Sequence, residues 1–128
     1  MENEQEKKFK AEVKKYEKYM AALNEWQETA EQSKTNIDYC LNIEKAINYC
    51  NKALFCLQSI FDICNNNTNL LKYLEDENSP ISNYYSLKVK IKLVLIALMQ
   101  NYFEHAKKII KKKTFKKKKN GMIFDGEF

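Results

Sequence analysis

The chain of 128 residues contains no arginine, two glycines, one proline and one histidine. An average protein of this length would hold roughly nine glycines and six prolines. Because hairpins and tight turns depend on those two residues, their scarcity argues against a β-sandwich, a barrel or a glycine-rich nucleotide-binding fold. The lack of arginine argues against planar, two-point recognition of phosphate, because a lysine ammonium is a point charge. What remains is a single, almost entirely helical domain.

Three long segments carry apolar residues at steps of three and four, the spacing that places side chains on one face of a helix. The predicted long helices cover residues 5–32, 35–64 and 81–112, and a short helix covers residues 69–75. The second long segment has two neighbouring apolar stripes instead of one. We therefore expect this helix to lie at the centre and to pack against neighbours on two sides.

Hydroxyl side chains mark two of the predicted helix starts. Thr35 is expected to cap the second long helix, with Asp38 at the spacing of a capping box. Ser79 is expected to cap the last helix, because a hydroxyl oxygen can accept a free N–H group of the first turn. Pro80 then suits the first helical position, where its missing N–H is not needed.

Residues 87–93 present an ambiguous pattern, because apolar residues and lysines alternate strictly there. Such alternation taken alone indicates a β-strand. No other segment supplies a convincing partner strand, and an isolated strand is unstable. A helical stripe also continues through the segment: Leu87, Ile91, Val94, Leu95, Leu98, Tyr102, Ala106 and Ile109. We expect a helix here, with a strand as the alternative.

Two segments resemble the second helix of tetratricopeptide-type (TPR-like) helical hairpins. Residues 42–54 read NIEKAINYCNKAL, and residues 97–110 read ALMQNYFEHAKKII. Their shared alanines, Ala46 and Ala106, are 60 residues apart, whereas the true repeat has a period of about 34 residues. Three-helix domains of the microtubule-interacting and trafficking type look similar at this level. The resemblance implies an irregular array or bundle of helical hairpins, and it does not extend to a peptide-binding groove at named residues.

The predicted fold class is therefore all-α, either an irregular antiparallel bundle or TPR-like hairpins. It has about three long helices and one short one. Residues 1–112 are expected to form the bundle domain, and residues 113–128 a basic, flexible C-terminal tail.

The positive charge is confined to one segment. Residues 1–106 hold 13 lysines and 15 acidic residues, whereas residues 107–119 hold nine lysines and no acidic residue. Such a run indicates a solvated, partly disordered tail, or a helix end at which cations are favoured near the negative pole. The functional alternative is a contact with RNA, DNA, an acidic protein or a nuclear-import receptor. The lysines concerned are Lys107, Lys108, Lys111, Lys112, Lys113, Lys116, Lys117, Lys118 and Lys119.

The sequence offers little catalytic or metal-binding chemistry. Its four cysteines lie on apolar stripes of a single helix, which favours buried free thiols in a reducing compartment over disulfides or zinc. His105 is expected at a polar surface position, without a nucleophilic partner. We expect no enzyme activity, no cofactor, no metal site and no small-molecule substrate.

We therefore expect a non-enzymatic helical scaffold or adaptor that binds another protein or a second copy of itself within a larger assembly. The residues around 87–98 are apolar nearly all round, which suggests that another chain covers part of them. Candidate interface residues are Tyr84, Tyr85, Val89, Leu93, Phe103, Phe124 and Phe128. The alternative is a protein associated with RNA or the ribosome that neutralises phosphates through the lysine-rich segment.

An intracellular location, cytoplasmic or nuclear, is expected. The first residues are acidic and polar, unlike a secretory signal peptide. The longest uncharged apolar run, residues 93–99, is far shorter than the roughly 20 residues that cross a bilayer. No membrane partner is expected.

Overall fold

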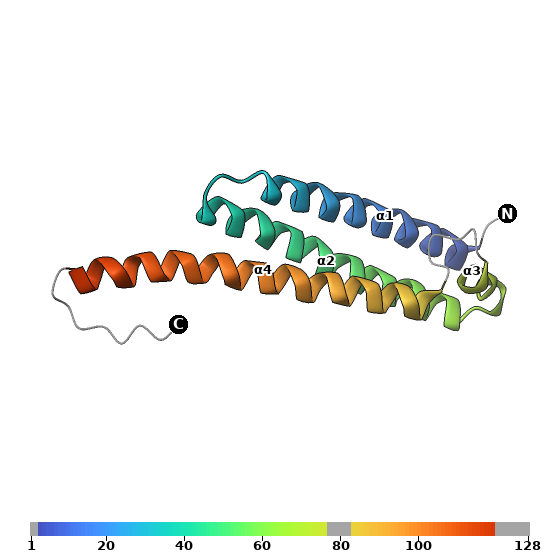
Figure 1. The fold of residues 1–128 in the computed structure, drawn as a ribbon. Coiled ribbons are helices and arrows are strands. Elements are labelled where there is room, and N and C mark those ends of the chain that lie inside the picture. The colour runs from blue at the N-terminus through green and yellow to red at the C-terminus, as the bar shows by residue number, and fades with distance from the viewer. Residues whose placement is uncertain (1–2, 77–82, 120–128) are drawn as a thin grey trace.

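The computed structural model describes residues 3–76 and 83–119, with side chains described as far as Lys111. Three long helices dominate, and no strand occurs within these two ranges. The elements are α1 (Glu4–Glu31), α2 (Asn36–Asn65), a 3-10 turn η1 (Thr68–Leu70), α3 (Lys72–Glu75) and α4 (Tyr84–Lys119). α1 and α4 both run antiparallel to α2 and lie on different sides of it (Figure 1). The expected all-α helical bundle is confirmed.

Side-chain caps and a tight turn set the start of the first two helices. At the N-terminus of α1, the Asn3 side chain accepts a hydrogen bond from the Glu6 N–H at 2.8 Å. The Thr35 hydroxyl accepts one from the Asp38 N–H at 3.0 Å, which confirms the predicted cap of α2. Between the helices, the Asn42 side-chain amide donates to the Ser33 hydroxyl at 2.9 Å and closes the turn.

The α1–α2 interface follows a seven-residue repeat. The four buried residues of α1 are each seven positions apart: Phe9, Tyr16, Leu23 and Ala30. Seven of the nine buried residues of α2 form two such series, Ile43, Cys50, Leu57 and Cys64, and Ala46, Ala53 and Ile60, and the other two are Cys40 and Cys56. This pattern is typical of antiparallel helices that pack side by side with knobs in holes. The fully buried alanines let the two backbones approach closely.

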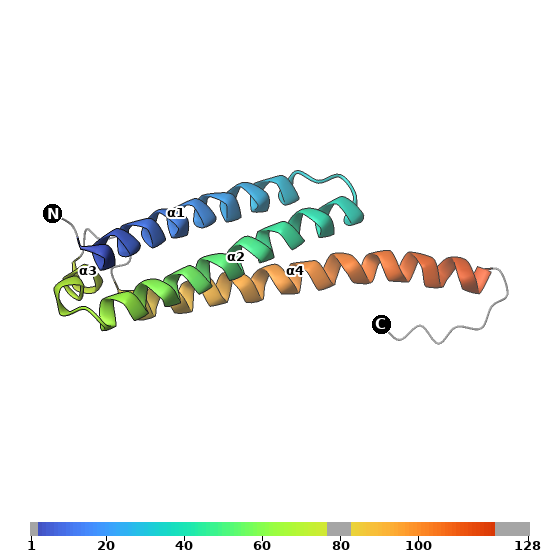
Figure 2. The ribbon, with the colours of Figure 1, turned by 180° about the vertical axis from the view of Figure 1, so that it is seen from behind.

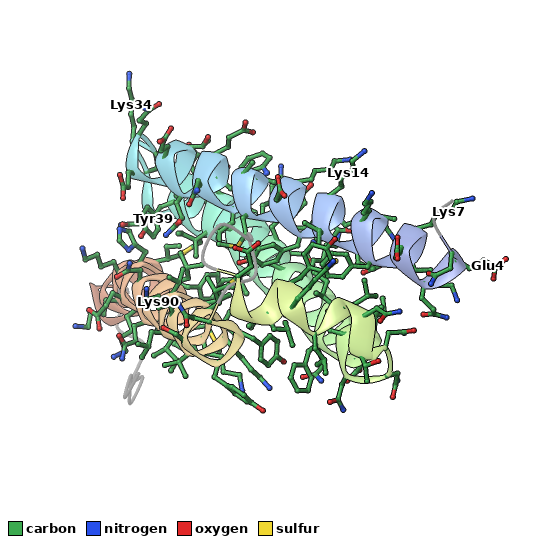
Figure 3. All side chains as sticks on the ribbon, turned by 90° about the vertical axis from the view of Figure 1, so that its right-hand side faces the viewer. Glu4, Lys7, Lys14, Lys34, Tyr39 and Lys90 are labelled. Carbon is green, nitrogen blue, oxygen red and sulfur yellow. The ribbon has the colours of Figure 1, made fainter. Side chains whose placement is uncertain are left out.

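α2 is the central helix, as expected, because α4 packs on its other side. The Phe61 ring stacks on Tyr84 with centroids 4.4 Å apart, and the Tyr39 ring stacks on His105 at 3.6 Å. Seen from the end of the molecule, the Tyr39 side chain lies on the side of the α1–α2 pair that faces α4 (Figure 3). Lys7 and Lys14 of α1 point outward in the same view. The stacked pairs therefore mark the two ends of the α2–α4 contact.

Residues 87–93 are helical, so the preferred interpretation of the alternating segment is confirmed. Ile91 is only 3% exposed in the middle of the α2–α4 contact. Burial of such side chains against α2 stabilises the helix, whereas a strand would have no neighbour to complete its hydrogen bonds.

The described helix α4 covers Tyr84–Lys119, whereas residues 81–112 were expected. The predicted start, with Ser79 and Pro80, lies outside the described residues. Asn83 precedes the first turn with a left-handed φ of 58°, which asparagine tolerates better than most residues. The expected end at residue 112 is wrong, because α4 continues to Lys119. Lysine forms helices well and is favoured near the negative C-terminal pole, so the predicted tail is helical over residues 113–119.

Candidate protein-binding face of α4

A row of large apolar side chains lies on the side of α4 that α2 does not cover. These residues are between 43% and 71% exposed. They are Tyr85, Val89, Leu93, Ile96, Met99 and Phe103, and we call them the α4 stripe. Their steps of three and four residues place them along one side of the helix. The stripe is therefore one continuous exposed surface.

Two seven-residue series explain why α4 is apolar on two sides. Tyr84, Ile91 and Leu98 form the series that packs on α2, and each is at most 5% exposed. Val89, Ile96 and Phe103 form the second series, and each is more than half exposed. Because the series are offset by five positions, they point in different directions. A single neighbour can cover only one of them.

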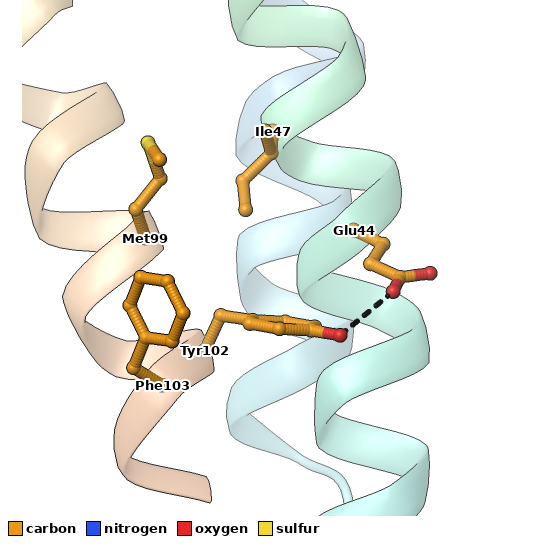
Figure 4. Close-up of a pocket in the computed structure, with 5 residues that line it drawn as sticks. All are labelled: Glu44, Ile47, Met99, Tyr102 and Phe103. Carbon is orange, nitrogen blue, oxygen red and sulfur yellow. Dashed lines mark hydrogen bonds between the residues drawn. The ribbon is translucent and has the colours of Figure 1, made fainter. Parts of the chain in front are cut away.

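The stripe ends beside a small hollow between α4 and α2 (Figure 4). The hollow has a volume of about 250 Å³ and is lined by Met99, Tyr102 and Phe103 of α4 and by Glu44 and Ile47 of α2. The Tyr102 hydroxyl donates a hydrogen bond to the Glu44 carboxylate at 3.1 Å. That hydrogen bond raises the pKa of Tyr102. The result is an apolar recess with one acidic group at its edge.

Lysines lie beside the N-terminal half of the stripe and beyond its C-terminal end, and none occurs between Leu93 and Phe103. Lys92 is exposed and lies between Val89 and Ile96 on the same side of the helix. Lys88 donates to the Gln58 side chain at 3.3 Å. α4 carries twelve lysines and a single acidic residue, Glu104. Positive charge therefore flanks the exposed apolar surface, with three lysines beside its first half and nine beyond Phe103.

The structure places four of the seven predicted interface residues on the stripe: Tyr85, Val89, Leu93 and Phe103. Phe124 and Phe128 lie outside the described residues.

The assignment of Tyr84 to the interface is wrong, because its ring is 5% exposed and belongs to the core. It stacks on Phe61, and its hydroxyl donates to the Gln58 side chain at 3.0 Å. Ile96 and Met99 were missed by sequence reasoning. The seven-residue spacing from Val89 through Ile96 to Phe103 was the signal that could have identified Ile96.

The lysine-rich segment lies at the C-terminal end of α4. Lys107, Lys108 and Lys111 are exposed, and the Lys107 ammonium is 3.9 Å from the Glu104 carboxylate. The side chains of Lys112, Lys113, Lys116, Lys117, Lys118 and Lys119 lie outside the described part. Figures 1 and 2 both show the last turns of α4 extending past the turn between α1 and α2. These lysines therefore lie on a projecting helix, at a distance from the α1–α2 hairpin.

All four cysteines are free and buried, as expected. Burial raises the pKa of the Cys50 and Cys64 thiols to about 11. Burial and a hydrogen bond to Glu12 raise the pKa of the Cys56 thiol to about 12. A thiol with such a pKa stays protonated at neutral pH and is a poor nucleophile. The cysteines therefore serve as packing residues.

The raised thiol pKa values predict a loss of stability in alkali. An unfolded thiol loses its proton near pH 9, whereas the folded Cys50 thiol keeps its proton up to about pH 11. Between these values the unfolded state binds fewer protons, so the free energy of unfolding falls as the pH rises, by up to about 1.4 kcal/mol per pH unit and thiol. Urea unfolding at pH 8–11 should show a shallower decline for Cys50→Ala than for the wild type. Equal slopes would contradict this assignment.

His105 differs from its expected polar surface position. Its ring is half-buried against Tyr39, and its Nδ1 lies 3.0 Å from the Asn101 carbonyl oxygen. It therefore contributes to the α2–α4 contact. Among the described residues, no three histidine, cysteine or acidic side chains gather as a metal site would require.

Comparisons with protein-family models, with characterised proteins and with solved structures find no match to this chain. The tetratricopeptide-type resemblance thus stays a prediction. Within the described ranges, no helix combines the length and the apolar character needed to cross a bilayer. The α4 stripe, its hollow and the lysines beside them are therefore the features on which a functional argument can rest.

Proposed function

We propose that this protein is a non-enzymatic helical scaffold or adaptor that binds another protein through the α4 stripe. One observation carries the proposal: six large apolar side chains form a continuous exposed row on a helix that packs on α2 through another side. Exposed apolar surfaces of this kind are uncommon on monomers and mark interaction sites. Aromatic residues and methionine, which interface cores favour, make up half of the stripe.

The way in which the three long helices pack supports this function. α1 and α2 form the knobs-in-holes hairpin, and α4 lies against α2 through its own buried series. The stripe thus lies on a helix held in place by the core, which reduces the entropy lost on binding. Four buried thiols without a disulfide support an intracellular, reducing location, cytoplasmic or nuclear.

The proposal can be tested by native mass spectrometry of the protein purified from its own cells. We expect a protein partner of defined mass that is lost when Leu93 and Ile96 are both replaced by glutamate. Two charges in an apolar interface cost several kcal/mol, enough to lower the affinity more than a hundredfold. A matched control replaces Phe55, which is 78% exposed on α2, with glutamate and should retain the partner.

A second candidate function is contact with RNA or DNA through the lysine-rich end of α4. The projecting helix and its nine lysines favour this alternative, because lysines along a helix neutralise phosphates without reading bases. In the same experiment, replacing residues 116–119 with glutamine decides between the two. If that variant loses co-purified nucleic acid, identified by its digestion with nuclease, and the stripe variant loses nothing, nucleic-acid binding would replace the scaffold function as the proposal.

A further inference from the structure

We infer that the occupant of the α4 stripe is an acidic amphipathic helix of a partner protein, lying along α4 with one apolar side chain in the hollow beside Met99. This inference names the partner class for the site proposed above and rests on that function. The shape of the stripe, its charges and the hollow support it.

The shape of the stripe suits a helix. From Tyr85 to Phe103 the stripe is about 27 Å long at the usual rise of a helix, which corresponds to about five turns of a second helix. The exposed side chains recur at steps of three and four, so they form ridges into which the side chains of another helix can fit. An extended strand would find no free backbone groups on α4, because an α-helix satisfies its own.

The charges select an acidic partner. Lys92 lies within the stripe itself, Lys88 directly precedes Val89, and Lys107 follows Phe103 by one helical turn. Lys88 already donates to Gln58 and Lys107 lies near Glu104, but a neutral helix over the exposed Lys92 would take water from its ammonium group and give nothing in return, which is costly. Carboxylates on both sides of the partner's apolar face would pair with these lysines and also favour encounter.

The same charges argue against a second copy of this chain. Two α4 helices side by side would each bring twelve lysines and one glutamate, Glu104, which already lies 3.9 Å from Lys107. Like charges that approach within the Debye length, about 8 Å at physiological salt, repel one another. An interface between two α4 stripes would therefore oppose its own apolar gain.

The hollow supplies an anchor point. Its volume of about 250 Å³ and its apolar lining suit one leucine, methionine or phenylalanine side chain. The Glu44 carboxylate, held by the Tyr102 hydroxyl, lies at the α2 edge of the hollow, whereas the lysines follow α4. The partner helix should therefore place its acidic residues on the α4 side and none beside Glu44.

Three designed peptides test the inference against the full-length protein by fluorescence anisotropy. All three are amphipathic helices of about 21 residues with the same leucines, and the flanking positions carry glutamate, glutamine or lysine. We expect the glutamate peptide to bind about tenfold more tightly than the glutamine peptide, with an advantage that shrinks as salt rises. The lysine peptide should bind most weakly.

Protein variants assign the binding to the stripe. Ile96→Glu should abolish binding of the glutamate peptide, whereas the exposed control Phe55→Glu should leave it unchanged. Lys92→Glu should remove most of the preference for the glutamate peptide. Replacing residues 116–119 with glutamine should change it little, since those lysines lie beyond the stripe.

The outcomes separate the two proposals. Equal binding of the glutamate and glutamine peptides that still depends on Ile96 would overturn the acidic partner and leave the stripe as a binding face. Binding that ignores Ile96, or no binding of any peptide, would overturn the acidic-helix inference, and the test on purified complexes decides the scaffold function separately. A dimer that Ile96→Glu dissociates, seen by analytical ultracentrifugation, would identify a second copy as the occupant.

Discussion

Replacement of Leu57 by alanine is expected to lower the free energy of unfolding by about 2–5 kcal/mol. Leu57 is fully buried in α2 and is among the largest side chains that solvent does not reach. It belongs to the seven-residue series that also holds Cys50 and Cys64, at the centre of the three-helix core. Alanine there loses the transfer free energy of three carbons and leaves a cavity that the helices cannot fully close.

Leu93 provides the matched control, because the same substitution is made on a side chain that is 59% exposed. Leu93→Ala should change the free energy of unfolding by no more than about 0.5 kcal/mol. Urea unfolding followed by circular dichroism measures both variants. Similar losses at the two positions would mean that the stripe is covered within the folded monomer, which contradicts both its exposure and its proposed use.

The second large effect is expected for Lys90→Pro, which should cost about 3 kcal/mol or more. Lys90 is the seventh residue of α4 and lies at an exposed position in the alternating segment. Proline there removes one backbone hydrogen bond and clashes with the carbonyl group of the preceding turn. Because α4 contributes Ile91 and Leu98 to the core, a break at this point also weakens their contact with α2.

Lys90→Ala keeps the helix and should leave the free energy of unfolding within about 0.5 kcal/mol of the wild type. The comparison of the two variants by urea unfolding isolates the backbone effect from the loss of the side chain. If proline were tolerated as well as alanine, residues 87–93 would not be helical in solution, and the strand alternative would return.

Local patterns were enough to predict the helices. Thr35 with Asp38 predicted the start of α2, and the continuous stripe through Leu87 and Ile91 was sufficient to prefer a helix over the alternating strand pattern. These features depend on residues within one or two turns of each other. The end of α4 was placed too early because the lysine run was interpreted through its charge alone, although lysine is itself a good helix former.

The candidate site was predictable in part, because its apolar residues also form a local pattern along one helix. Tyr85, Val89, Leu93 and Phe103 were identified because the segment is apolar nearly all round. Tyr84 was assigned with them because adjacent residues on a helix are indistinguishable without knowledge of which side is covered. Ile96 was missed, although it shares the seven-residue spacing of Val89 and Phe103.

By itself the sequence determined that this protein is helical, where its long helices lie, and that its last helix has two apolar sides among lysines. Only the tertiary structure decided which side is buried. Tyr84 packs because Phe61 and Gln58 of α2 meet it, and one step along the chain Tyr85 is 71% exposed. Periodicity is a local property of one helix, whereas burial depends on which neighbour reaches it, and one neighbour covers only one face.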